Sequence, residues 1–255
     1  MLQVRKPTLL CLLLPAALCA GTRDLSVVTL NLAKEPSAAR MAAEIGAVPA
    51  LRNADVFLLQ EVEPRSAAAE LGAKLGLHVV GSKEAAEIPN LGLAILSRYP
   101  LRDVRIRPLR KYDLVYHSRS RFALSATADT PWGPVRIVNT HLDTRLNAPD
   151  RLAQLEDAIR DLGAGPTIVG GDFNSNWFYW IHHVLPVPAG SQGKPVSSFM
   201  SKAGYRSAIP ASLTTFDWLG QHLDWIWLRG LGTAESRVYP LKFSDHHACW
   251  TRVAI

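Results

Sequence analysis

The sequence predicts an α/β domain built on mixed β-sheets, and three observations lead to this fold class. Short apolar runs of strand length recur along the whole chain. Helical patterns lie between several of them, as in sheets that are covered by helices. The runs within 91–96, 122–128 and 135–140 follow one another without a helical pattern between them. Hairpins are therefore expected, and a purely parallel, doubly wound sheet is excluded.

The expected strands are apolar or β-branched runs in this order: Leu25–Leu32, Val56–Leu59, Leu93–Leu96, Phe122–Ala126, Val135–Asn139, Thr167–Val169, Leu223–Leu228 and Ala248–Val253. Helices are expected over the Ala-rich segment Pro36–Leu51, over Pro64–Leu75, and over Asp150–Leu162, which starts at an Asp and stops before a Gly. No linker interrupts the series, so we expect one domain over residues 22–255.

The composition is that of an ordinary globular protein. Of 255 residues, 48% are hydrophobic and 20% are charged, which excludes a disordered chain, collagen and a coiled coil. Three scattered cysteines are too few for a disulfide scaffold or a zinc cluster.

The N-terminus has the pattern of a signal peptide over residues 1–20. Arg5 and Lys6 precede the apolar run Leu9–Ala20, and small residues follow. The run is shorter than the about 20 apolar residues that span a bilayer. We expect an exported protein, periplasmic or secreted, with an uncleaved membrane anchor as the alternative.

Positive charge is concentrated in one segment. The chain has a formal net charge of +6, and residues 101–121 contain seven Lys and Arg against two Asp. One interpretation is a solvated hairpin, and the other is a cationic lip that steers an anionic substrate toward a nearby site. Both interpretations remain open at this stage.

Polar side chains stand at one end of six of the expected strands. They are Asn31, Glu61, His141, Asp172 with Asn174, Asp224, and Asp245 with His246. Strand ends in layered α/β folds often meet at one rim, where catalytic groups gather.

Metal-assisted hydrolysis of a phosphate ester requires such a set. Glu61 and Asp245 offer the oxygen ligands that Mg²⁺ prefers, with Asn31 as a neutral ligand. His246 is a natural base for an attacking water, and Asp224 could fix its tautomer.

Two further side chains complete this chemistry. His141 and Asn174 could donate hydrogen bonds to the negative charge that develops on the phosphate.

The ordered motifs resemble the endonuclease/exonuclease/phosphatase superfamily, which has the deoxyribonuclease I-like fold. The resemblance spans residues 26–253 and rests on Asn31, Leu59-Gln60-Glu61, Asn139-Thr140-His141, Gly171-Asp172-Phe173-Asn174, Leu223-Asp224-Trp225-Ile226 and Ser244-Asp245-His246. It implies a four-layer α/β/β/α sandwich, with two mixed sheets face to face and helices outside.

The resemblance also implies roles for these residues. Glu61 would be the principal metal ligand, with Asn31 and Asp245 close by. Asp172 and Asn174 would align the attacking water and contact the phosphate.

His141 would lie against the phosphate. His246, oriented by Asp224, would accept the proton of the attacking water, and it is favoured over Asp172 as this general base. Arg121 matches a position near the phosphate in relatives, with Arg119 as its alternative.

Several other side chains receive structural interpretations. The block Trp177–Ile181 has helical spacing and is expected to pack in the core, the alternative being a membrane or base-stacking surface. Trp218, Trp225 and Trp227 are expected in the core or in a pocket wall. Arg151 and Gln154 are expected to be structural.

Together these features predict an Mg²⁺-dependent phosphoesterase, with Mn²⁺ as a substitute. A phosphodiesterase acting on nucleic acid is preferred because of the charge. A sphingomyelinase-like or phosphoinositide-type lipid phosphoesterase is the alternative, and a non-catalytic binding protein on the same fold is the third. We expect a monomer without a stable protein partner.

Overall fold

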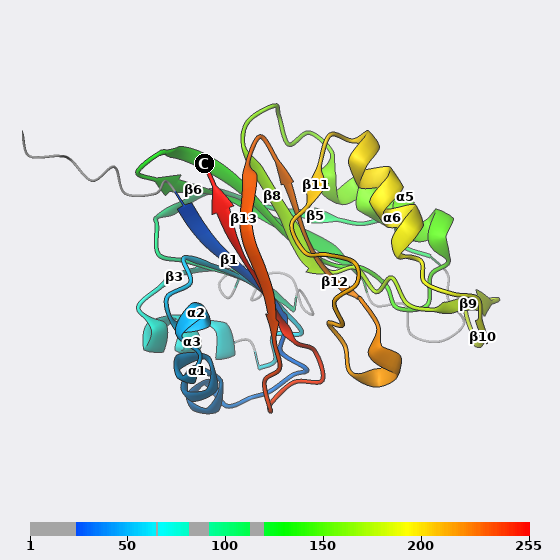
Figure 1. The fold of residues 1–255 in the computed structure, drawn as a ribbon, viewed down its shortest axis with the longest axis horizontal. Helices are drawn as coiled ribbons and strands as arrows, with labels where there is room; N and C mark the ends of the chain where they lie inside the picture. The colour runs from blue at the N-terminus through cyan, green and yellow to red at the C-terminus, as the bar shows by residue number, and fades with distance from the viewer. Residues whose placement is uncertain (1–23, 65, 82–91, 113–119) are drawn as a thin grey trace, which may run out of the picture.

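The computed structural model describes residues 24–64, 66–81, 92–112 and 120–255. The predicted signal peptide and Arg119 lie outside these residues. Within them, two mixed sheets pack face to face and helices cover both outer faces (Figure 1). The predicted fold class is therefore confirmed.

The first sheet has six strands in the order β13-β14-β1-β2-β4-β3. β1 runs parallel to β2, and every other neighbouring pair is antiparallel. The strands are β1 Asp24–Asn31, β2 Val56–Gln60, β3 His78–Val80, β4 Leu93–Ser97, β13 Gly232–Tyr239 and β14 Ala248–Ala254.

The second sheet has six strands in the order β11-β12-β8-β7-β6-β5. Here β7 and β8 form the parallel pair. The strands are β5 Leu101–Pro108, β6 Phe122–Thr130, β7 Gly133–His141, β8 Thr167–Asp172, β11 Arg206–Ser207 and β12 Asp224–Arg229. All eight expected strands are present, and β3, β5, β11 and β13 add to them.

Three apolar cores hold the four layers together. One lies between the sheets and contains Val27 and Leu58 from the first sheet and Ile137 and Ile226 from the second. The second core joins the first sheet to its helices, and the third joins the second sheet to its own. The helices are α1 Ala38–Ala47, α2 Pro49–Arg52 and α3 Ala67–Leu75 on the first sheet, and α5 Ala148–Ile159 and α6 Gly193–Lys202 on the second.

Local sequence explains where these helices begin and end. Ser37 caps α1 by accepting a hydrogen bond from the backbone N–H of Arg40. α3 ends at Gly76, which has a left-handed backbone (φ 68°). Among the described residues, no helix is long and apolar enough to cross a membrane.

Gly171 allows the two central strands of the second sheet to approach each other. Its φ is +139°, and a Cβ atom there would lie 1.9 Å from the carbonyl oxygen of Thr140 on β7. No other residue fits at this point without moving the strand. The first residue of the predicted motif at 171–174 is therefore a glycine because the two strands pack closely there.

The aromatic block is not a core helix, so that prediction is wrong. Phe178–Ile181 forms strand β9, which pairs with β10, Leu185–Pro188, in a separate two-stranded ribbon. Aromatic and β-branched residues favour strands, and Pro186 and Pro188 are tolerated at a sheet edge but not inside a helix. Trp177 and Tyr179 are exposed, and Trp180 is half-buried.

Candidate active site

The polar strand ends meet in one cavity. β1 and β2 bring Asn31 and Glu61 from the first sheet, and β7 and β8 bring residues from the second. Seven of the predicted site residues line its wall: Asn31, Glu61, His141, Asp172, Asn174, Asp245 and His246. Asp224 lies behind His246, and Arg121 precedes β6, half-buried and outside the cavity lining.

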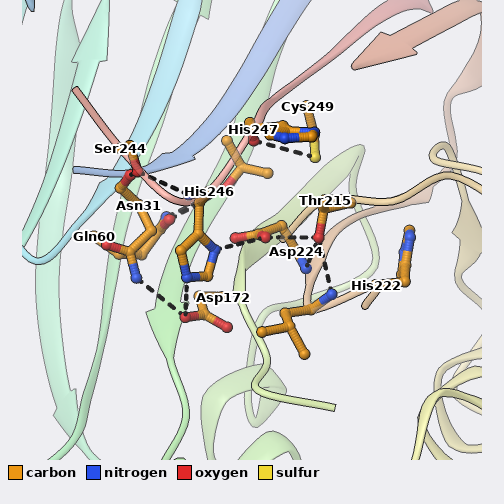
Figure 2. A network of polar contacts seen from close by, with 12 residues as sticks. Asn31, Gln60, Asp172, Thr215, His222, Asp224, Ser244, His246, His247 and Cys249 are labelled. Carbon is orange, nitrogen blue, oxygen red and sulfur yellow. Dashed lines mark hydrogen bonds and ion pairs between the residues drawn. The ribbon is translucent and has the colours of Figure 1, made fainter. Parts of the chain in front are cut away.

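His246 and Asp224 form a hydrogen-bonded pair with a third member, Thr215 (Figure 2). His246 Nδ1 lies 2.9 Å from Asp224 Oδ2, and Thr215 Oγ1 donates to the same oxygen at 2.8 Å. Thr215 Oγ1 in turn accepts hydrogen bonds from the backbone N–H groups of Leu223 and Asp224. This network fixes the imidazole with Nε2 toward the cavity.

Asp172 is the central carboxylate of the site. Its Oδ2 lies 3.4 Å from His141 Nε2 and 3.8 Å from His246 Nε2. It also accepts a hydrogen bond from Asn31 Nδ2 at 3.1 Å, while Oδ1 accepts from the backbone N–H of Asn174 at 2.8 Å. The two sheets thus share one buried acid, which binds two imidazoles and two amides.

The pKa values of both Asp172 and His246 are raised, by burial for the carboxyl group and by neighbouring negative charge for the imidazole. Desolvation is the main cause of the shift of the Asp172 pKa to about 6, and the nearby Asp224 charge adds to it. Burial alone would lower the pKa of His246, but attraction from Asp224 and Asp172 outweighs it and raises this pKa. The two carboxylates therefore favour the protonated imidazole, while burial favours the neutral form that can accept a proton.

Glu61 and Asp245 face the same cavity with fewer protein contacts. Glu61 is half-buried with a left-handed backbone (φ 50°), a strained conformation that recurs at functional sites. Asp245 is exposed, and Asn31 lies buried on the same wall. Two carboxylates and an amide oxygen form a donor set that suits a hard divalent cation.

A second group could also hold a metal ion. Asp172, Asp224 and His246 offer ligand atoms that lie within 4.8 Å of one another. However, Asp224 is fully buried, and its Oδ2 is engaged by both Thr215 and His246. The wall with Glu61 and Asp245 is more accessible to solvent and substrate.

Glu61 is positioned by a buried network that joins the two sheets. Gln60 Nε2 donates to Asn139 Oδ1 at 2.7 Å, and Asn139 Nδ2 donates to the carbonyl oxygens of Leu59 and Ala94. The side chain at the end of β7 therefore fixes the end of β2, from which Glu61 follows. Both residues belong to the predicted motifs, although the sequence alone assigned them no role.

One wall of the cavity is apolar, and Trp218 is the one of its aromatic side chains for which a pocket wall was among the predicted positions. Phe178 and Trp180 of β9 contribute to it together with Phe216 and Trp218. The rings of Phe178 and Trp218 stack with 5.4 Å between their centroids. Trp218 is thus a pocket-wall residue, while Trp225 and Trp227 are core residues, as expected.

The predicted structural role of Arg151 is confirmed. It is fully buried and donates to the carbonyl oxygens of Asp143, Leu146 and Phe173. It therefore ties the loop after β7 to the loop after β8, and both loops carry site residues.

The described part of the basic segment lies against acidic residues. Arg102 pairs with Asp103 and Asp129, Arg107 with Asp161, and Arg110 with Glu156 and Asp157. None of residues 101–112 lines the cavity. The net positive charge predicted for this segment is therefore largely neutralised in space, which does not support a cationic lip.

Two packed mixed sheets with a polar cavity at their shared end define a phosphoesterase fold of the deoxyribonuclease I type. The chain belongs to the endonuclease/exonuclease/phosphatase family, whose model matches residues 28–246. A comparison with curated proteins found no match.

Solved structures share the fold at low sequence identity. An endonuclease/exonuclease/phosphatase from Beutenbergia cavernae aligns with TM-score 0.68 and 21% identity over 91% of this chain and 72% of its own. One from Bacteroides vulgatus aligns with TM-score 0.66 and 16% identity over 91% and 99%. The catalytic domain of human Nocturnin, solved with a sulfate anion, aligns with TM-score 0.63 and 21% identity over 91% and 93%.

Proposed function

We propose that this protein is a divalent-metal-dependent phosphodiesterase that uses water as its nucleophile. The observation that carries the proposal is the cavity itself, where a hydrogen-bonded His246–Asp224 pair faces Asp172 and opens beside Glu61 and Asp245. Family membership supports the reaction class, because members of the family are phosphoester hydrolases.

Glu61, Asp245 and Asn31 would hold the cation, which we propose is Mg²⁺, with Mn²⁺ as a substitute. A cation bound there would polarise a phosphoryl oxygen and stabilise its developing negative charge. His141 and Asn174, both on the cavity wall, would donate hydrogen bonds to the phosphate.

The proton of the attacking water would pass to the Asp172–His246 pair. His246 is the favoured base because it lines the cavity and Asp224 orients its imidazole through Nδ1. Asp172, with its raised pKa, would orient the water and is the alternative acceptor.

The substrate we favour is a phosphodiester with an apolar or aromatic substituent. The preference for nucleic acid rested on the basic segment, and carboxylates oppose the cations of its described part. A lipid phosphoester gains support from the apolar cavity wall. One observation supports nucleic acid as the alternative substrate, because a base could stack on the Phe178–Trp218 pair.

The test is turnover of bis(p-nitrophenyl) phosphate with Mg²⁺, with Mn²⁺ and with EDTA. Glu61→Ala and His246→Ala should each lower turnover, the second by about 10²–10⁴-fold. His247→Ala is the matched control, because this neighbouring histidine pairs with Asp217 outside the cavity. Absence of turnover on a panel of diesters, together with no effect of EDTA, would exclude the proposal. Mg²⁺ binding without turnover would instead favour a non-catalytic binding protein.

We also propose that the protein is exported, on the basis of the pattern in residues 1–20. The N-terminal mass of protein recovered from a bacterial periplasm or culture medium tests both export and cleavage. Intact protein found only in the cytoplasm would contradict export.

A further inference from the structure

The exposed apolar side chains of the described chain gather at one place. Every large hydrophobic residue among them that is exposed lies in one of two segments, 177–187 and 218–219. The most exposed are Tyr179 at 54%, Leu185 at 58% and Trp218 at 58%. Contiguous exposed apolar surface on a soluble domain usually marks a binding face.

The ribbon of β9 and β10 is apolar on both of its faces. Trp180 opposes Pro186 on one face, and this face forms part of the cavity wall. On the other face Tyr179 opposes Val187 and Ile181 opposes Leu185, and all four side chains are exposed. A ribbon packed against the protein on one side needs only one apolar face, so the outer face requires another explanation.

The ribbon lies at one end of the molecule. Figure 1 shows β9 and β10 extending beyond both sheets, next to α5 and α6. We call the outer face of this ribbon the apolar rim, which consists of Tyr179, Ile181, Leu185 and Val187. The rim and the cavity share this ribbon, because its inner face lines the cavity, where Phe178 stacks on Trp218.

We propose that the apolar rim docks the protein on a phospholipid bilayer, so that the cavity receives its phosphodiester from the membrane surface. The inference rests on the proposed function for the substrate but not for the docking. A tyrosine next to aliphatic side chains is a combination that enters the interfacial layer of a membrane.

The absence of charged side chains in the ribbon favours a bilayer over nucleic acid as the surface that the rim binds. Residues 177–193 contain no Lys, Arg, Asp or Glu. A nucleic-acid surface would need cations for the phosphate backbone, whereas a zwitterionic lipid surface needs none.

The experiment measures co-sedimentation of the protein with phosphatidylcholine vesicles and with vesicles that also contain phosphatidylglycerol. We expect the wild-type chain to bind both, with little dependence on salt. The double variant Ile181→Ser/Leu185→Ser removes a cross-strand pair from the outer face, and its partition coefficient should fall about tenfold or more.

The matched control is Ile181→Leu/Leu185→Ile, which changes the same positions but keeps them apolar and should bind like the wild type. Turnover of the soluble bis(p-nitrophenyl) phosphate, measured in parallel, reports on the folded site, since neither residue lines the cavity. Vesicle binding without turnover of this diester would support the docking and count against the proposed activity, so the two failures are distinguishable.

Three results would overturn the docking. The first is no vesicle binding by the wild type, and the second is equal vesicle binding by the Ser variant. The third is that the Ser substitutions leave vesicle binding unchanged but abolish a concentration-dependent dimer or binding to a single-stranded oligonucleotide. Gel filtration and fluorescence anisotropy provide these last two readouts.

Discussion

Asp224 can orient His246 only because Thr215 holds its carboxylate in place. Thr215 Oγ1 donates to Asp224 and accepts from two backbone N–H groups, so one hydroxyl serves three buried partners. Residues that orient a catalytic or metal-bound histidine through its second nitrogen commonly change activity by about 10–100-fold when they are replaced. Thr215 belongs to this group although it does not line the cavity.

Thr215→Val should therefore lower kcat by about 10–100-fold and reduce the free energy of unfolding, because its three partners lose a hydrogen bond in a buried place. Thr215→Ser keeps the hydroxyl and should restore most of both quantities. Steady-state turnover and urea unfolding provide the measurements. Equal activity of the Val and Ser variants would show that the hydroxyl has no positioning role.

Gly171 offers a second test at this scale. Gly171→Ala places a Cβ atom against the Thr140 carbonyl at a positive φ and should lower the free energy of unfolding by at least about 3 kcal/mol. The matched control is Gly46→Ala in α1, where a Cβ meets nothing within 4 Å. This change should stabilise the protein by about 0.5–1 kcal/mol. If both variants unfold at the same urea concentration, the close strand contact does not limit the fold.

At the scale of elements, the loops after β7 and β8 owe their positions to Arg151 on α5. Burial lowers the pKa of this guanidinium to about 10, so it remains charged at neutral pH. Its hydrogen bonds go to backbone carbonyls, which form a polar cage for the charge.

Arg151→Met should lower the free energy of unfolding by at least about 3 kcal/mol, because several buried carbonyls lose a charged donor together. It should also lower kcat, since Phe173 lies between Asp172 and Asn174. The comparison is Arg160→Met at the exposed end of α5, with both quantities near wild type. Wild-type activity in a destabilised Arg151 variant would separate the stability of the loops from the chemistry of the site.

The same scale shows what the sequence could and could not predict. The strands that carry the site were found because each is a buried apolar run that ends in a polar residue, as with Val56–Gln60. The sequence did not predict β13, because it is a polar edge strand. It did not predict α6 either, because this helix contains Gly193, Pro195 and several serines. The ribbon was misread because five residues of aromatic sequence fit both periods, and only pairing with β10 decides between them.

Within the site, sequence order identified the side chains at strand ends but not their supports. Asn174 and Asp245 follow or precede core strands, so the motif marks them directly. Thr215 and Phe216 come from an irregular loop, and isolated bridges of Phe216 to Gln221 and to His246 place them. Such long-range contacts leave no periodic signal in the chain.

For the whole molecule, the distribution of charge in space differs from its distribution along the sequence. Positive residues are concentrated along β5 and the segment that follows it. The fold then brings Asp129, Glu156, Asp157 and Asp161 against them from β6 and from α5 and its end. A sum over sequence neighbours misses these carboxylates, because they are distant in the chain. At the cavity, by contrast, Arg145 lies over the ring of Trp180 at 5.7 Å.

The double variant Arg107→Gln/Arg110→Gln should consequently leave the KM for a small anionic diester unchanged at low and at physiological salt. Both cations already face carboxylates, and neither lines the cavity. Arg145→Gln is the matched change beside the cavity, because the Arg145 guanidinium lies over the ring of Trp180 in the cavity wall. It should raise KM, more at low salt than at high salt, because it removes a cation near the entering anion. If the double variant raises KM and weakens its salt dependence while Arg145→Gln does not, the basic segment steers the substrate after all. The acidic residues against it would then be insufficient to screen its field at the distance of the cavity.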